Sequence, residues 1–506
     1  MAGLPMLHMR SLLVGIMTAD GSATPNVPVI IGTQMQADDR FGVGSELSRM
    51  CRSFFRNNFA NEMWCLPVLE PLGASAATGT ITVSAPPTEA GTIHLYVGGQ
   101  HLPINIAGTD TAEEVAQWMV DQIEDEENFL VSAEVDGTDP TQINLTANFK
   151  GVHGNDIRVE LNYFGRLGGE TLPIGLELTL PATNFLTGGV GVPRFEAAIR
   201  AMGEMEYDFV GMPYTDSTSL MAWAMEYGMS DIGRWGWMRQ LFGSVFSARR
   251  GSYQDLIDFG LSRNDPVISV LAFEERTPTP MFEMTAAYVA KAQRALANDP
   301  ARPLQTLQLL GCLPAQQNFR FNWMELNAMA TSGLAIQKCW GGSAFPQIAR
   351  EQTTYQLNLY GFGDDSWELV TTLHTLTKLI RLQRHAITSK YPRHKLANDG
   401  TRFGPGQAIV TPGIIKAELI AQYRIDEYNG LVEDARNFKR HLITERDPNN
   451  PNRLNCLYPP DLINQLRIFG VLAQFRLQYD RGIDVEIVGY GSQVYSGSAQ
   501  GSRYAS

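Results

Sequence analysis

The chain contains few cysteines, and none of them has the spacing of a metal or redox site. Five cysteines occur in 506 residues, with no CxxC pair and no histidine at zinc-ligand spacing. Scattered cysteines of this kind are typical of small buried apolar side chains in a reducing compartment. We therefore predict no disulfide framework and no cysteine-bound metal at Cys51, Cys65, Cys312, Cys339 and Cys456.

Long apolar runs are missing as well. No window approaches the roughly 18 uninterrupted apolar residues that a membrane-spanning helix needs. The apolar run 12–17, which follows Arg10, is too short for the core of a signal peptide. We expect no membrane insertion, and a protein that is made and used in the cytoplasm unless lysis releases it.

The signatures of nucleotide and hydrolase chemistry are also absent. A phosphate-binding loop needs Gly-Lys followed by Ser or Thr, and the chain has no Gly-Lys dipeptide. Ser-His-Asp catalysis needs a serine on a tight glycine turn with a histidine beside it. Ser230 and Ser332 are the nearest approaches to such turns, and His153 lies in a different, β-rich part of the chain. We predict structural roles for these three residues and no enzymatic activity.

The eight histidines are dispersed along the chain. His94 and His101 form the closest pair, and no acidic residue or cysteine lies between them. Zinc sites usually require a denser set of ligands. We interpret this pair as packing or surface residues, and we predict no metal site and no cofactor.

Charge is unevenly distributed. The formal net charge of -13 argues against a chain that coats nucleic acid or an anionic membrane. Residues 376–453, in contrast, contain 14 Lys and Arg against 8 Asp and Glu, which leaves +6 in an acidic protein.

The basic residues of this region concentrate in its first part, where Asp399 is the single acidic residue. A solvated face and a docking surface for an acidic protein partner both explain this pattern. DNA binding is disfavoured, because aromatic residues are not interleaved as stacking platforms. The basic residues are Lys378, Arg381, Arg384, Lys390, Arg393, Lys395 and Arg402.

Changes in periodicity predict four parts. Small-residue linkers at 72–79 and 186–191 bracket a β-rich segment, which indicates a domain inserted into an α/β core. After the second linker, short apolar strands alternate with amphipathic helices, a pattern that favours a mainly parallel sheet. We predict the first part of the core at 1–73, the inserted domain at 74–188, the rest of the core at 189–375 and an α+β C-terminal domain at 376–506.

The C-terminal domain is predicted to end in strands. A helix opened by Thr411 and Pro412 runs to about residue 428, and an alternating strand is expected at 468–477. A last alternating strand precedes a tail of Gly, Ser, Tyr and Gln, and we predict that it pairs with a sheet of another subunit. That strand consists of Ile483, Asp484, Val485, Glu486, Ile487 and Val488.

Several motifs together resemble one protein family. The segment 391–412 combines a cation cluster, an Asn-Asp-Gly turn and the loop Phe403-Gly-Pro-Gly406. This segment resembles the sheath proteins of contractile bacteriophage tails, in the Mu-like branch. Five other motifs resemble the same family, and all of them occur in the same order along the chain as in that family. The resemblance spans roughly residues 10 to 478. The other motifs are Phe41-Gly-Val-Gly-Ser45, Arg234-Trp-Gly-Trp-Met-Arg-Gln240, Ser262-Arg-Asn264, the segment 296–306 and Pro459-Pro-Asp-Leu-Ile-Asn-Gln465.

This resemblance implies a structural function. Sheath subunits stack as hexameric rings around a tail tube, exchange strands with their neighbours, and contract to drive the tube through the host envelope for genome ejection. The implied core is a subtilisin-like sheet without a catalytic triad, and the implied partners are further copies, the tube protein, and the baseplate and tail terminator proteins. The tail of the virion is the implied location, with assembly in the host cytoplasm and no direct contact with nucleic acid.

The resemblance also implies that the basic C-terminal region faces the tube. Only about ten residues precede position 12, and the sequence leaves open whether an N-terminal arm joins the strand exchange. Two other functions remain open at this point: the sheath of a related injection machine such as a phage-tail-like bacteriocin, and a degenerate subtilisin-like peptidase.

Overall fold

The computed structural model describes residues 9–340 and 343–473, and these residues are organised around one mainly parallel sheet. The strand order is β13-β12-β11-β1-β3-β2, and every neighbouring pair is parallel except β2 and β3. The predicted parallel α/β core is confirmed. The strands are β1 (Ser11–Met17), β2 (Val29–Ile31), β3 (Met63–Leu69), β11 (Phe209–Gly211), β12 (Ser244–Gly251) and β13 (Ile268–Glu274).

Helices cover both faces of this sheet. Successive side chains of β1 point to opposite faces. Leu13 belongs to a hydrophobic cluster with α2 and α7, whereas Leu12 belongs to a second cluster with α4, α5, α6 and α8. Burial on both faces explains why β1 lacks polar side chains from Leu12 to Met17 and β13 from Val270 to Phe273. The helices are α1 (Gln34–Phe41), α2 (Glu46–Asn57), α4 (Glu196–Ala201), α5 (Ser217–Glu226), α6 (Tyr253–Leu261), α7 (Met281–Asn298) and α8 (Trp323–Thr331).

The segment between the two predicted linkers folds into sheets of its own. A four-stranded antiparallel sheet has the order β10-β4-β8-β7, and a three-stranded one has the order β6-β5-β9. The predicted β-rich character is confirmed. The elements are β4 (Ala76–Ala85), β5 (Gly91–Val97), β6 (Gln100–Ile106), α3 (Ala112–Asp125), β7 (Val131–Val135), β8 (Gln142–Lys150), η1 (Val152–Asp156), β9 (Val159–Leu161), η2 (Arg166–Gly168) and β10 (Glu177–Thr179).

The two linkers that enter and leave this segment run side by side. Ser75 pairs with Val190, and Thr78 with Thr187, as antiparallel bridges. The chain therefore crosses from the core to the inserted segment and back at one place, as expected for an insertion between two halves of a core.

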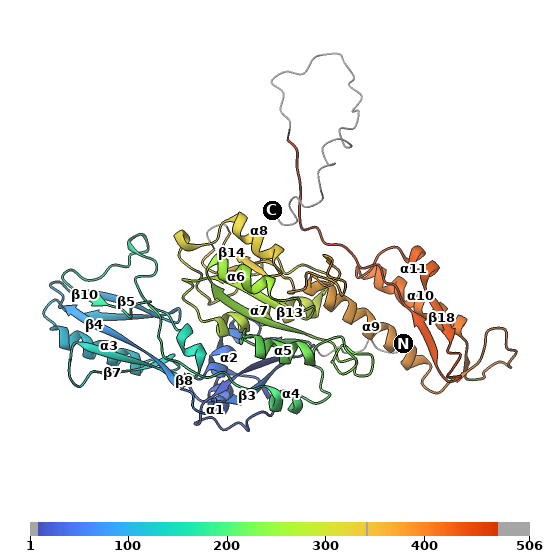
Figure 1. Cartoon of the computed structure of the whole chain (residues 1–506), viewed down its shortest axis with the longest axis horizontal. Coiled ribbons are helices and arrows are strands. Elements are labelled where there is room, and N and C mark those ends of the chain that lie inside the picture. The colour runs from blue at the N-terminus through green and yellow to red at the C-terminus, as the bar shows by residue number, and fades with distance from the viewer. Residues whose placement is uncertain (1–8, 341–342, 474–506) are drawn as a thin grey trace, which may run out of the picture.

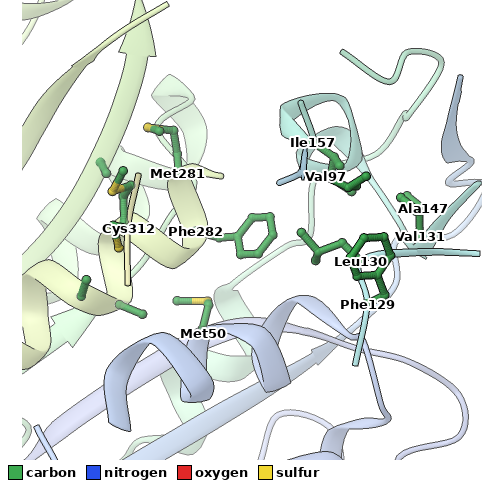
Figure 2. Close-up of a cluster of buried hydrophobic side chains, with 14 of the residues drawn as sticks. Met50, Val97, Phe129, Leu130, Val131, Ala147, Ile157, Met281, Phe282 and Cys312 are labelled. Carbon is green, nitrogen blue, oxygen red and sulfur yellow. The ribbon is translucent and has the colours of Figure 1, made fainter. Parts of the chain in front are cut away.

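The inserted segment also shares its hydrophobic core with the helices on one face of the central sheet. Phe282, near the start of α7, packs edge-on against Phe149 of β8, with ring centroids 5.7 Å apart. Figure 2 shows Phe282 of the core pointing toward Leu130 of the insert, with Phe129 beside Leu130. The insert and the core therefore share one continuous hydrophobic cluster, and they do not meet as two domains with separate cores.

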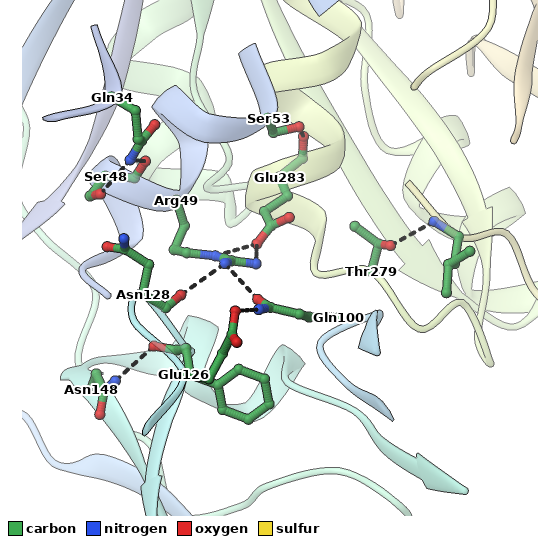
Figure 3. A network of polar contacts seen from close by, with 12 residues as sticks. Gln34, Ser48, Arg49, Ser53, Gln100, Glu126, Asn128, Asn148, Thr279 and Glu283 are labelled. Carbon is green, nitrogen blue, oxygen red and sulfur yellow. Dashed lines mark hydrogen bonds and ion pairs between the residues drawn. The ribbon is translucent and has the colours of Figure 1, made fainter. Parts of the chain in front are cut away.

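A buried polar network lies beside this packing (Figure 3). The guanidinium of Arg49 in α2 donates to the Glu283 carboxylate over 2.8 Å. It also donates to the side chain of Gln100 and to the backbone carbonyl of Asn128, both over 2.9 Å and both in the insert. Because the side chains of Arg49 and Glu283 are only 3% and 7% exposed, this ion pair needs both partners in place.

The C-terminal part forms a separate body at the opposite end of the molecule from the insert (Figure 1). Its hydrophobic cluster is separate from those of the sheet, and in it Tyr423 stacks on Phe438 with centroids 3.7 Å apart. Thr411 caps α10 and Pro412 is its first residue, as predicted. The elements are α9 (Val370–Lys390), β16 (Lys395–Leu396), β17 (Ile409–Val410), α10 (Pro412–Tyr428), α11 (Ala435–His441), β18 (Ile443–Arg446) and β19 (Leu454–Leu457).

Helix α9 joins the core to the C-terminal body. Its first turns pack on the central sheet, where His374 stacks on Phe209 with centroids 4.5 Å apart, and its later residues Leu379 and Leu382 enter the C-terminal cluster. The predicted boundary between residues 375 and 376 therefore lies inside a continuous helix. Among the described residues, no helix is both long and apolar enough to cross a membrane.

Candidate assembly surfaces

One residue of the predicted basic set, Arg381, is buried. Its guanidinium donates to Asp208 over 2.6 Å and to Glu206 over 3.1 Å, and the side chains of Arg381 and Asp208 are 4% and 0% exposed. Burial raises the pKa of Asp208 to about 6, because desolvation outweighs the attraction of the guanidinium. The assignment of Arg381 to a docking surface was wrong: this residue fixes α9 to the start of β11.

The other predicted basic residues lie nearer the solvent. Lys378 is half-buried. Burial raises the pKa of Asp426 to about 6, and the nearby charge of Lys378 partly offsets this rise. Lys390 is exposed and pairs with Glu418. We call the five exposed Lys and Arg residues of this stretch the basic surface. It consists of Arg384, Lys390, Arg393, Lys395 and Arg402.

The hairpin of β18 and β19 exposes apolar side chains. Ile443 and Leu457 are opposite each other in the antiparallel register and are 50% and 60% exposed. Within the described part of the chain, these two strands pair with each other alone. A two-stranded sheet is only marginally stable in water. This hairpin therefore offers free edges and an apolar surface to a further strand.

The described residues after the hairpin form an exposed arm, residues 463–473. Polar contacts hold its start: Ile463 donates its amide to the Leu431 carbonyl, and Arg467 donates to Glu351 over 3.0 Å. The apolar side chains of Phe469 and Leu472 are 79% and 88% exposed. In Figure 1 this part of the chain leaves the body as an extended segment.

The strand predicted at 468–477 is not formed in its described part, residues 468–473. A β-strand forms its ladder of backbone hydrogen bonds with a neighbouring strand, and within the described residues nothing pairs with this segment. The predicted inter-subunit strand, Ile483 to Val488, lies outside the described residues.

The candidate catalytic residues do not come together. His153 bonds through Nδ1 to the buried carboxylate of Glu46 over 2.7 Å, and Ser332 donates to the carbonyl of Ala328 over 3.0 Å at the end of α8. Ser230 lies exposed in a loop. In the described ranges 9–340 and 343–473, neither Ser230 nor Ser332 has a hydrogen bond to a histidine that could take its proton.

One Ser-His pair joins residues that are 130 positions apart in the sequence, so no local motif indicates it. Ser244 Oγ and His374 Nε2 are 2.8 Å apart, but the residues are 0% and 2% exposed. Burial, together with the charge of Arg381, lowers the pKa of His374 to about 3. No substrate can reach this pair, and we assign it a packing role between β12 and α9.

The structure also brings together His94, His101 and Glu170, which are dispersed in the sequence. His94 Nδ1 lies 3.0 Å from His101 Nε2 and 3.9 Å from Glu170 Oε1. One ligand atom from each residue lies within 4.8 Å of the others. No acidic residue lies between the two histidines in sequence, so the sequence alone does not indicate this cluster: Glu170 comes from a distant loop.

Comparisons with known proteins agree over most of the chain. The family model of the phage tail sheath protein central domain matches residues 188–337, and that of the phage tail sheath C-terminal domain matches residues 363–476. The chain is 37% identical over 476 residues to the Mu-like prophage FluMu tail sheath protein of Haemophilus influenzae, an alignment that covers 94% of each protein.

Solved sheath proteins are more distant. The sheath tail protein of Desulfitobacterium hafniense is 11% identical, with a TM-score of 0.44 over 92% of this chain and 99% of that chain. The one from Listeria innocua is 10% identical, with a TM-score of 0.46 over 91% and 93%. The family assignment therefore rests on the family models and on the Haemophilus relative.

Proposed function

Because this chain belongs to the phage tail sheath family, it is a structural sheath subunit, and we propose that its copies polymerise around a tail tube and contract to drive that tube through the host envelope. The observation that carries this proposal is the 37% identity to a Mu-like prophage tail sheath protein over 94% of both chains. The subunit belongs to the tail of the virion and assembles in the host cytoplasm.

We propose hexameric rings that stack into a helical sheath, with the tube protein, the baseplate and the tail terminator as further partners. The work of contraction comes from the lattice itself: a metastable extended arrangement relaxes into one with more favourable contacts. No enzymatic step takes part in this mechanism. The central sheet acts as a subtilisin-like core that carries packing residues in place of a catalytic triad.

We propose that subunits are linked by exchanged strands. Two observations support this: the β18–β19 hairpin has an exposed apolar pair, Ile443 and Leu457, and the arm 463–473 leaves its own body with Phe469 and Leu472 exposed. Strand addition supplies main-chain hydrogen bonds, which persist while the bodies of the subunits rotate. The donated strand is Ile483 to Val488, which follows the arm in the sequence.

We propose that the basic surface faces the tail tube. Opposed charge favours the correct docking register more than it adds affinity, and the local excess of Lys and Arg contrasts with an acidic protein. Arg381 is excluded from this surface because it is buried.

The linkage is tested by truncation and negative-stain electron microscopy. The full chain is expected to form tubes with added tail tube, whereas a chain that ends at Tyr479 folds with an unchanged thermal midpoint but stays monomeric. A chain that ends at Tyr490 retains the donated strand and serves as the matched control, which still assembles. Sheaths of normal length from the Tyr479 truncation would exclude strand exchange at this end. A full chain that forms no tubes at all would exclude the proposed polymer.

A further inference from the structure

The β5–β6 hairpin of the inserted segment places two histidines on one face. Its antiparallel register sets His94 opposite Pro103 and Tyr96 opposite His101. His94 and His101 are therefore diagonal neighbours on the same side of the hairpin, within reach of each other. Their rings turn one nitrogen each toward the other, 3.0 Å apart.

Glu170 completes this group from the loop after η2. Its Oε2 accepts the Phe164 amide over 2.9 Å, and its Oε1 accepts the Tyr96 hydroxyl. The residue is 7% exposed. Two hydrogen bonds thus fix the direction of a nearly buried carboxylate, as the outer contacts of metal-binding carboxylates do.

We propose that His94 Nδ1, His101 Nε2 and a carboxylate oxygen of Glu170 bind one divalent transition-metal ion, of which zinc is the best fit. Two imidazoles and one carboxylate are a common three-ligand set for zinc, with a further position open to water. Magnesium and calcium prefer oxygen ligands throughout, which this set does not supply.

The spacing of the ligand atoms suits such an ion. Zinc bonds of about 2.0 to 2.2 Å place tetrahedral ligand atoms roughly 3.3 to 3.6 Å apart. The two measured separations from His94 Nδ1, 3.0 and 3.9 Å, lie on either side of that value. The third separation, between His101 Nε2 and the Glu170 carboxylate, is within 4.8 Å. Binding the ion therefore requires the histidine pair to open and the carboxylate to approach by side-chain rotation, and the exposed ring of His101 provides the entry path.

The bound ion would join the β5–β6 hairpin to the loop that carries Glu170. Both elements belong to the inserted segment, away from the arm and the basic surface. The proposal is therefore independent of strand exchange and of docking on the tube.

Metal binding is tested with the full chain after treatment with a chelator. Isothermal titration with zinc is expected to show one tight site per chain, and cobalt is expected to give visible absorption typical of low-coordinate ligation. His101→Ala, at an exposed position, should weaken zinc binding at least about tenfold. His94→Ala and Glu170→Gln should weaken it as well, and calcium should not compete.

The matched control is His441→Ala, which removes an exposed histidine of α11 far along the chain. It should leave zinc binding unchanged, and the metal-free circular dichroism of all variants should match that of the unmodified protein. Equal zinc binding by His101→Ala and the unmodified protein would overturn the site. So would an unmodified protein that binds no zinc, or one that binds calcium equally well.

Discussion

The inserted segment shares one hydrophobic core with the helices of the central sheet, whereas the C-terminal body buries a core of its own. Phe282 of the core packs on Phe149 of the insert, while Tyr423 and Phe438 pack with each other in a cluster that the sheet does not enter. The C-terminal body is attached through α9 and through ion pairs made by Arg381 and Arg467.

This difference indicates which parts move together. Separation of the insert from the core would expose continuous apolar surface, which costs about 25 cal/mol per Å². Separation of the C-terminal body would break the ion pairs of Arg381 on α9 and Arg467 in the arm, and it would expose little apolar surface beyond Ala301. We therefore expect the insert and the core to behave as one unit, and the C-terminal body as a second unit whose position depends on α9.

The largest expected effect comes from Phe282→Ala at the shared core. Loss of a buried phenyl ring should lower the free energy of unfolding by about 3 to 5 kcal/mol. All eight tryptophans lie before residue 370, in the core and the insert. Tryptophan fluorescence during urea unfolding should therefore report this loss directly.

The matched substitution is Phe438→Ala in the C-terminal cluster. It should lower the stability of that body, as seen by far-UV circular dichroism, and leave the tryptophan transition in place. If both variants shifted the tryptophan transition equally, the two regions would share one cooperative unit and the comparison would fail.

The second largest effect on stability is expected from the ion pair between Arg381 of α9 and Asp208. Arg381→Met leaves the buried carboxylate of Asp208 without its main partner and should cost about 3 kcal/mol at pH 8. The pKa of Asp208, already raised to about 6, should rise further without the guanidinium. At pH 5 the carboxyl group is then protonated in the folded state while the unfolded state still favours the anion.

The folded form of this variant therefore binds an extra proton at pH 5, and its stability relative to the unmodified protein should recover as pH falls from 8 to 5. Urea unfolding at the two pH values measures this. Arg384→Met, one turn further along α9 and exposed, is the control and should change stability by less than about 0.5 kcal/mol. A deficit that is equal at both pH values would show that Asp208 is not the cause.

The smallest effect on stability is expected from the basic surface. Replacement of Lys390, Arg393 and Lys395 by Glu should lower the thermal midpoint only slightly, because these side chains are exposed and the pair of Lys390 with Glu418 is a surface ion pair. It should nevertheless impair assembly on tail tubes at low salt, as sedimentation with purified tubes would show. Unimpaired assembly would mean that these residues form a solvated face.

Local sequence was sufficient for much of the fold. The apolar runs of β1 and β13 predict strands buried on both faces, and Thr411 with Pro412 predicts the start of α10. Each of these signals lies within a few neighbouring residues, so periodicity and capping preferences report it without knowledge of the rest of the chain. The family motifs are likewise readable in order along the sequence.

Tertiary structure alone decided the role of charged and polar residues. In the sequence, Arg381 is one of seven cations along a basic stretch. In the structure it is buried, and it forms an ion pair with Asp208, 173 residues earlier. Glu170, from the loop after η2, lies beside His94 of β5, whose strand pairs with the strand of His101. Phe282 of the core packs against Phe149 of the insert. In each case the partner is distant in sequence, and burial, which sets the strength of a charge or a contact, exists only once the chain has folded.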